Sequence, residues 1–178
     1  MPRKKLIPDA DVYATIRRLI AIEGEKAASF GTLARMTGLS APTLVQRYGA
    51  QDDMIRIAVQ DGWSQLDALT IRLEAEADLS PKGAQGLLKA LQSEAMAQDG
   101  SGLIDPALFA YTLRDAGLRT RATMWRQRVE RALALRLGGG DKGQDAASLM
   151  FAAWQGQLIW LHAGGKGFRL KDAVKRFS

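Results

Sequence analysis

The sequence predicts an all-α fold for a chain of 178 residues. Apolar residues recur every three or four positions along most of the chain, which is the spacing of one helix face, while strand-like alternation is nearly absent. Glycine and proline separate these periodic segments, as expected for helices joined by short loops. Hydrophobic residues make up 47% and charged residues 25%, which is typical of a folded rather than a disordered protein.

The first part of the chain contains two clear helical segments before residue 38. The first is expected at about 11–23, with Asp11 as its cap and Gly24 at its end, and its apolar face is formed by Val12, Ile16, Leu19 and Ile20. A second, shorter helix is expected at about 32–37, with Thr32 as its cap.

The remainder of the chain is also expected to be helical. Asp52 and Asp53 favour the start of a long helix that runs to about Glu76, because their charge complements the helix dipole. Further helices are expected at about 82–98, 106–114, 116–137 and 144–163, with a short terminal helix that carries Leu170, Ala173, Val174 and Phe177. The helix at 144–163 is apolar on several faces, so we expect its own core and a partner subunit to bury it.

The composition argues against several kinds of chemical site. The absence of Cys excludes disulfide scaffolds, cysteine-ligated metals and cysteine nucleophiles, and a single His162 argues against histidine metal clusters and Ser-His-Asp catalysis. Gly138 and Gly143 have the spacing of a phosphate-binding loop, but Gln144 stands where that loop needs lysine. We therefore expect no enzyme activity and no cofactor.

The sequence also predicts a cytoplasmic protein with no membrane partner. No run approaches the roughly 20 apolar residues that a membrane-spanning helix needs. The N-terminal charges are not followed by the apolar stretch of a signal peptide before Asp9 and Asp11.

The net charge of +6 is distributed unevenly along the chain. Residues 1–50 carry +4, residues 51–113 carry −6 and residues 114–178 carry +8, which suggests a charged partner for at least one end. The largest basic run consists of Arg114, Arg119, Arg121, Arg126, Arg128, Arg131 and Arg136. Three interpretations of this run remain open: a solvated helix face, ion-pair partners for the acidic middle, or a surface for anions or DNA.

The strongest local pattern lies at residues 29–48 and predicts a helix-turn-helix. Ala34 is small enough for the two helices to approach closely, and Gly38 permits the positive φ of the turn between them. Leu39 and Leu44 are expected to hold the second helix against the core. A plain helical hairpin is the alternative interpretation.

The second helix of this pattern begins after Ser40 and runs to about Tyr48. The Ser40 hydroxyl is a good N-cap, and Pro42 suits the first turn. The side chains expected to face outward are Ala41, Pro42, Thr43, Gln46 and Arg47. In a DNA major groove, Gln can read adenine and Arg can read guanine, so this helix predicts binding to double-stranded DNA.

These residues resemble the TetR family of transcriptional regulators. The resemblance covers about residues 11–60 and rests on the first helix together with Leu33-Ala34, Gly38-Leu39-Ser40, Thr43-Leu44, Tyr48-Gly49 and Asp53-Met54. It implies an N-terminal three-helix DNA-binding domain at 1–53 and a C-terminal helical ligand-binding and dimerisation domain at 54–178. It further implies a homodimer that binds a palindromic operator, usually as a repressor, and is released by a small-molecule effector.

The resemblance also implies which residues contact DNA: Thr32, Ser40, Ala41, Pro42, Thr43, Gln46, Arg47, Tyr48 and Gln51. Two positions depart from the family pattern, because Val45 replaces the usual aromatic residue and Gln51 replaces the usual lysine. Both family residues typically touch phosphates. We therefore expect a basic arm just before the first helix, formed by Arg3, Lys4 and Lys5, to supply the missing charge.

In the same scheme, an effector pocket would be lined or flanked by Trp63, Leu66, Leu87, Leu91, Phe109, Leu113, Trp125 and Val129, although the composition of each position favours a plain core over a ligand contact. The dimer interface is expected to consist of Trp154, Gly156, Leu158 and Leu161, with Gly156 allowing two copies to approach closely. Two other functions remain open. One is a helical dimeric interaction protein that has kept the fold but lost operator binding, and the other is a small helical enzyme.

Overall fold

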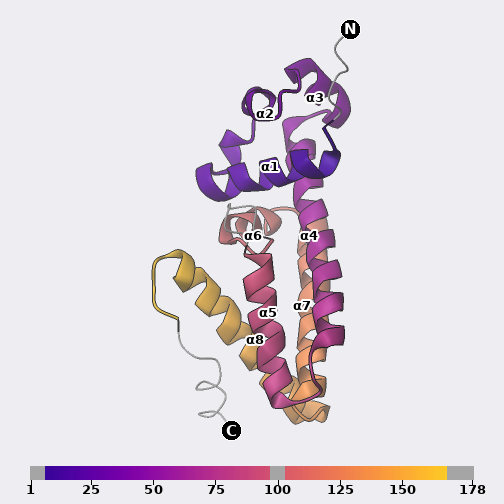
Figure 1. Ribbon diagram of the computed structural model, residues 1–178, viewed down its shortest axis with the longest axis vertical. Coiled ribbons are helices and arrows are strands. Elements are labelled where there is room, and N and C mark those ends of the chain that lie inside the picture. Colours follow the sequence, from indigo (N-terminus) through magenta and orange to yellow (C-terminus); the bar gives the residue numbers. More distant parts are fainter. Residues whose placement is uncertain (1–6, 97–102, 168–178) are drawn as a thin grey trace. The chain divides into compact units, whose positions relative to one another are not determined.

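The computed structural model describes residues 7–96 and 103–167. Within these residues the backbone forms eight α-helices, one short 3-10 helix and no strand, so the predicted all-α fold is confirmed (Figure 1). No helix in this described part is long and apolar enough to cross a membrane.

The helices are α1 (Asp9–Glu23), η1 (Glu25–Ala27), α2 (Phe30–Thr37), α3 (Ala41–Tyr48), α4 (Gln51–Glu76), α5 (Pro81–Ala95), α6 (Pro106–Thr112), α7 (Ala116–Arg136) and α8 (Gly140–His162). Most boundaries lie within three residues of the prediction, but α8 begins four residues earlier than expected. The backbone enters this helix directly from the glycine-rich turn, and Asp141 then lies in its first turn. The expected terminal helix lies outside the described residues.

Two predicted helix caps are wrong by about one turn. Helix α1 begins directly after Pro8, so Asp11 lies inside its first turn rather than at the cap position. Helix α2 begins after Ser29, whose Oγ accepts a hydrogen bond from the backbone N–H of Thr32 at 3.2 Å. In α2 the better cap, Ser29, precedes the predicted one by three residues, whereas α1 begins without a side-chain cap, so no capping residue marks its start.

The chain packs as two compact units. The first consists of residues up to Leu66 together with Ala95–Arg119, and the second consists of Asp67–Glu94 together with the residues from Thr120 on. Helix α4 continues without a break from the first unit into the second. The sequence places a functional boundary after residue 53, and that boundary remains a prediction.

In the first unit, α1 packs against α2 and α6, and α2 packs against α3. The predicted apolar face of α1 is confirmed, because Val12, Ile16, Leu19 and Ile20 are all buried. Leu33 from α2, Leu44 from α3 and Met54 from α4 are fully buried as well. The burial of these side chains is the main source of stability for this arrangement.

The core of the second unit contains a cluster of three aromatic rings on α7 and α8. The Trp125 ring lies 5.8 Å from that of Phe151 and 6.4 Å from that of Trp154, measured between centroids. Trp125 also donates a hydrogen bond from Nε1 to Thr70 Oγ1 on α4 at 2.9 Å. The cluster therefore joins three helices of this unit.

The basic run on α7 contacts the acidic residues of α4 in the second unit. Arg121 pairs with Asp67 at 2.8 Å, and Arg128 pairs with Glu74 at 3.4 Å. The buried Arg136 donates to backbone carbonyl oxygens at the end of α4, where a positive charge complements the helix dipole. Of the three interpretations of this run, these contacts favour ion pairing with the acidic middle of the chain.

Candidate nucleic-acid interface on helices α2 and α3

The turn between α2 and α3 has the geometry that the sequence predicts. Gly38 has a φ of 74° and donates its N–H to the carbonyl of Ala34 at 3.0 Å, which closes α2. Ser40 then caps α3, because its Oγ accepts a hydrogen bond from the N–H of Thr43 at 3.2 Å. The direction in which α3 leaves the turn is therefore determined by a few local residues.

Replacing Ser40 with Ala is expected to lower the free energy of unfolding by about 1 kcal/mol, since the N-terminal N–H groups of α3 lose their acceptor. Urea unfolding followed by circular dichroism measures this change. Ser93→Ala is the matched control, because Ser93 is exposed within α5, and it should stay within about 0.5 kcal/mol of the natural chain. An equal effect of both substitutions would contradict the capping role.

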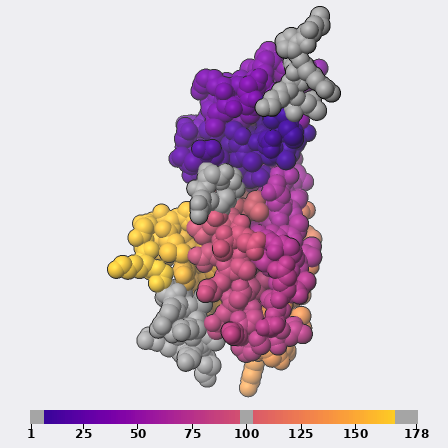
Figure 2. All heavy atoms as spheres, in the orientation of Figure 1, coloured from indigo at the N-terminus to yellow at the C-terminus, as the bar shows by residue number. Residues whose placement is uncertain are grey.

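Helix α3 has a buried side and an exposed side. Leu44 is fully buried and Tyr48 is 7% exposed, so these two residues hold the helix against the first unit. The exposed side chains are Pro42, Val45, Gln46 and Arg47, while Ala41 and Thr43 are half-buried. Figure 2 draws the side chains of α1 to α3 in indigo and violet, packed closely together. Of the five residues expected to face outward, Pro42, Gln46 and Arg47 are therefore exposed, while Ala41 and Thr43 are only half-buried.

Tyr48 and Arg47 are both engaged with the start of α1. The Tyr48 hydroxyl donates to Asp9 Oδ1 at 2.5 Å, and burial together with this hydrogen bond raises the pKa of Tyr48. Arg47 pairs with the same carboxylate oxygen at 2.8 Å and donates to the carbonyl of Ile7 at 3.2 Å. Asp9 was not among the predicted site residues, because it lies 38 positions before Arg47 and no local pattern links the two.

The other predicted DNA contacts are placed as follows. Thr32 is half-buried, and its Oγ1 lies 3.0 Å from Ser29 Oγ at the start of α2. Gln51 is half-buried at the first residue of α4. The exposed Arg35 on α2 donates to Thr32 Oγ1 at 3.4 Å and adds a charge that the prediction omitted. Arg3, Lys4 and Lys5 lie outside the described residues.

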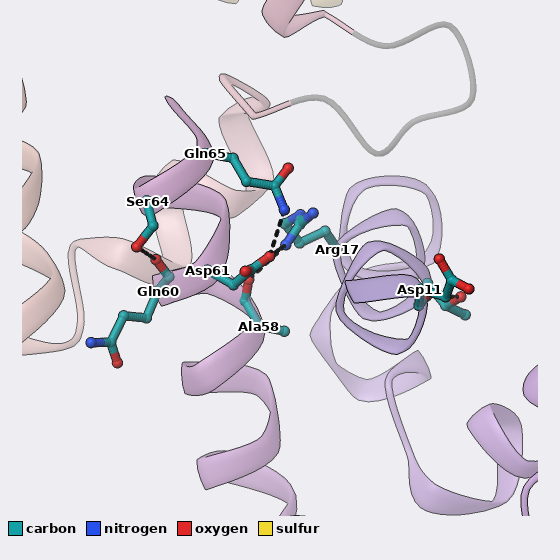
Figure 3. Close-up of polar contacts among 8 residues, drawn as sticks. Asp11, Arg17, Ala58, Gln60, Asp61, Ser64 and Gln65 are labelled. Atoms are coloured by element: carbon teal, nitrogen blue, oxygen red, sulfur yellow. Dashed lines mark hydrogen bonds and ion pairs between the residues drawn. The ribbon is translucent and has the colours of Figure 1, made fainter. Parts of the chain in front are cut away.

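A buried ion pair joins α1 to α4 (Figure 3). Arg17 is 3% exposed and donates from Nη1 to Asp61 Oδ2 at 2.7 Å and to the carbonyl of Ala58 at 3.0 Å. Gly62 provides the space, since a Cβ atom there would lie 2.9 Å from Cδ of Arg17. Gln65 also donates to Asp61 at 2.7 Å. This ion pair therefore connects α1 to the long helix α4.

Replacing Asp61 with Ala is expected to lower the free energy of unfolding by about 2 kcal/mol, because the buried guanidinium of Arg17 loses its counter-ion. The loss is smaller than for a fully buried pair, since the Asp61 side chain is 28% exposed. Asp53→Ala is the control, because it removes an exposed carboxylate that pairs with Arg56 only three residues away. Equal stability of the two variants in urea unfolding would contradict this account.

Charged side chains also line a hollow of about 340 Å³ in the first unit. Its walls are formed by Glu25, Asp52, Asp53, Arg56, Tyr111, Arg114 and Asp115. Arg56 pairs with Asp53, and Arg114 pairs with Glu25. Both arginines in the wall of this hollow are therefore already paired with carboxylates.

The eight residues predicted to line an effector pocket are divided between the two units. Trp63, Leu66, Phe109 and Leu113 belong to the first unit, and Leu87, Leu91, Trp125 and Val129 belong to the second. Six are buried, whereas Phe109 is 36% and Leu113 is 51% exposed. A hollow of about 310 Å³ in the second unit has Leu87 in its wall, beside Leu73 and Gly83. The pocket itself stays a prediction.

The residues predicted for a dimer interface lie on different sides of α8. Trp154 is fully buried and Leu158 is 5% exposed within a single chain, so neither offers surface to a partner. Gly156 and Leu161 are half-buried. Large exposed apolar side chains are instead found at Leu149, Ile159 and Trp160, which are 58%, 56% and 68% exposed. Figure 2 shows the C-terminal part of α8, in yellow, at the surface.

Comparison with known protein families finds no family that matches this chain, and no curated protein matches it either.

Proposed function

We propose that the protein is a DNA-binding transcriptional regulator that binds a palindromic operator as a homodimer and resembles the TetR family. In this proposal α2, the turn at Gly38 and α3 form a helix-turn-helix, and α3 enters the major groove. Residues 1–53 form the DNA-binding domain, and residues 54–178 bind an effector and the partner subunit.

The geometry of α3 is the main support for this proposal. Its N-terminus is capped by Ser40, its inner side is held by Leu44, and its outer side is exposed. A short, rigid and exposed helix of this kind is what a major groove accommodates, because the groove is about as wide as one helix with its side chains. The basic head of the chain favours a polyanionic partner.

The dimer part of the proposal is supported by the exposed apolar side of α8. Leu149, Ile159 and Trp160 are large apolar side chains on a helix that also carries the small Gly156. A stable dimer needs a buried interface of at least about 1,000 Å². We assign the seam to this exposed side of α8 in place of Trp154 and Leu158.

The experiment that tests the proposal is a gel-shift titration of the full chain against DNA flanking its own gene. Specific binding should withstand a large excess of unrelated duplex, and Gln46→Ala should weaken operator binding by about tenfold or more. Lys89→Gln on α5 is the control, since it removes an exposed charge far from α3 in the sequence. If unrelated duplex at the same concentration as the operator competes it off the protein, operator recognition is contradicted.

The basic arm gives a further expected result. Each phosphate neutralised by a lysine or arginine adds about 0.9 to the slope of log affinity against log salt. A chain that begins at Ile7 lacks Arg3, Lys4 and Lys5, so a dimer should lose at most about 5 units of slope and realistically about half that number. Operator affinity measured between low and high salt checks this value. Parallel plots for the two chains would mean that the arm does not touch DNA.

A second candidate function is a helical dimeric interaction protein that has kept the fold but lost operator binding. The observation that favours it is the engagement of Arg47 with Asp9, together with Val45 and Gln51 at positions where the family usually contacts phosphate. The same titration separates the two functions, because an interaction protein should show no preference among duplexes.

A further inference from the structure

Helix α3 offers a partner few polar atoms. Pro42 and the half-buried Ala41 have purely apolar side chains on the outward side of this helix. Val45 is 47% exposed, and contact of its apolar side chain with water contributes no stability to the fold. The hydroxyl of Thr43 lies 2.7 Å from Ser40 Oγ and belongs to the cap. Pro42 and Val45 therefore give the exposed surface of this helix an apolar part.

The charged residue of α3 is already engaged. The two terminal nitrogens of Arg47 contact Asp9 and the carbonyl of Ile7, and its guanidinium lies 5.5 Å from the ring of Tyr48. Reading guanine requires two N–H donors of a free guanidinium. The side chain of Gln46 is exposed and has no hydrogen-bond partner among the described residues, so its amide is the polar group that α3 presents.

We propose that α3 recognises A·T base pairs, with Val45 packed on a thymine methyl group and Gln46 paired with adenine. Thymine is the base that displays a methyl group in the major groove, and an amide side chain matches the N6 and N7 atoms of adenine. Arg47 then acts as a positioning residue that holds α3 against α1 through Asp9. This inference rests on the proposed function and specifies the base pairs that the site recognises.

The test uses duplexes that the full chain enriches from a random-sequence pool. The enriched half-sites should be rich in A·T pairs at the positions that α3 contacts. The same duplexes are then prepared with uracil in place of thymine, which removes only the methyl groups. Because burial of one methyl-sized group changes affinity by about fourfold, the two half-sites of a dimer should together lose about 16-fold in binding.

Two variants assign this loss to Val45. Val45→Ala should bind the thymine and uracil duplexes with nearly equal affinity, since the packing surface for the methyl group is gone. Ile22→Ala is the matched control, because Ile22 is a comparably exposed apolar residue at the end of α1 and not on α3. This control should keep the ratio of the natural chain.

The role of Arg47 is tested on the same duplexes. A positioning role predicts that Arg47→Ala and Asp9→Ala weaken binding to a similar extent, without relaxing the preference at any one base pair, and that the double variant is no weaker than either. Two results would overturn the inference while leaving DNA binding intact. One is a guanine-rich half-site whose base preference is weakened by Arg47→Ala, and the other is equal binding of thymine and uracil duplexes by the natural chain. Failure to enrich any duplex would overturn the proposed function itself and, with it, this inference.

Discussion

Replacing Trp160 with Asp is expected to turn the protein into a monomer while each chain stays folded. Trp160 is 68% exposed on α8, beside the exposed Ile159, so the substitution removes little packing from its own chain. In the proposed dimer it would place an unpaired charge inside an apolar interface. The free energy needed to remove that charge from water would exceed what the remaining interface contacts provide. Sedimentation velocity measures the change in mass directly.

Loss of the dimer should also weaken operator binding by about 100-fold or more, because the second head no longer benefits from the first being bound. Leu79→Asp is the control, since it adds the same charge at an exposed leucine outside the helices, and it should remain dimeric. The same charge at the buried Leu158 is expected to unfold the second unit instead of separating subunits. A Trp160→Asp protein that still sediments as a dimer would remove α8 from the proposed seam.

Replacing Trp154 with Ala is expected to lower the free energy of unfolding by about 3–5 kcal/mol, the range found for large aromatic side chains removed from a core. Trp154 is fully buried, and its ring centroid lies 5.8 Å from that of Phe151. The vacated space adjoins Trp125 as well, so neighbouring helices cannot close it by a small shift. Urea unfolding at a fixed protein concentration measures the loss.

Trp154→Phe is the matched variant for this prediction. It keeps an aromatic ring in the cluster, and it removes the indole N–H of Trp154, which has no hydrogen-bond partner among the described residues. We expect it to cost less than about 1.5 kcal/mol, because most of the packing is retained. A cost of under 1 kcal/mol for Trp154→Ala would show that the aromatic cluster does not form the core of this unit.

Features that depend on neighbouring residues could be predicted from the sequence. The turn at Gly38 and the cap at Ser40 are encoded within a few positions, and the structure has both as expected. The caps predicted at Asp11 and Thr32 are wrong, because α1 begins without a side-chain cap and Ser29 caps α2 ahead of Thr32. Periodicity gives the face of a helix more accurately than its first residue.

Features that depend on distant residues could not be predicted in the same way. Asp9 lies 38 positions before Arg47, and no local pattern indicates which carboxylate an exposed arginine will meet. On α8 the apolar residues surround the helix, so periodicity alone does not distinguish the inward Trp154 from the outward Trp160. Likewise, the arginines of α7 can be identified as ion-pair partners only once the positions of Asp67 and Glu74 on α4 are known.

Hydrogen–deuterium exchange of the full chain, with and without an enriched duplex, tests directly whether α3 binds DNA. We expect the duplex to slow exchange most strongly in peptides that cover α3 and the start of α4, with little change along α7. Slowed exchange along the arginine-rich α7, with α3 unchanged, would contradict DNA binding by α3.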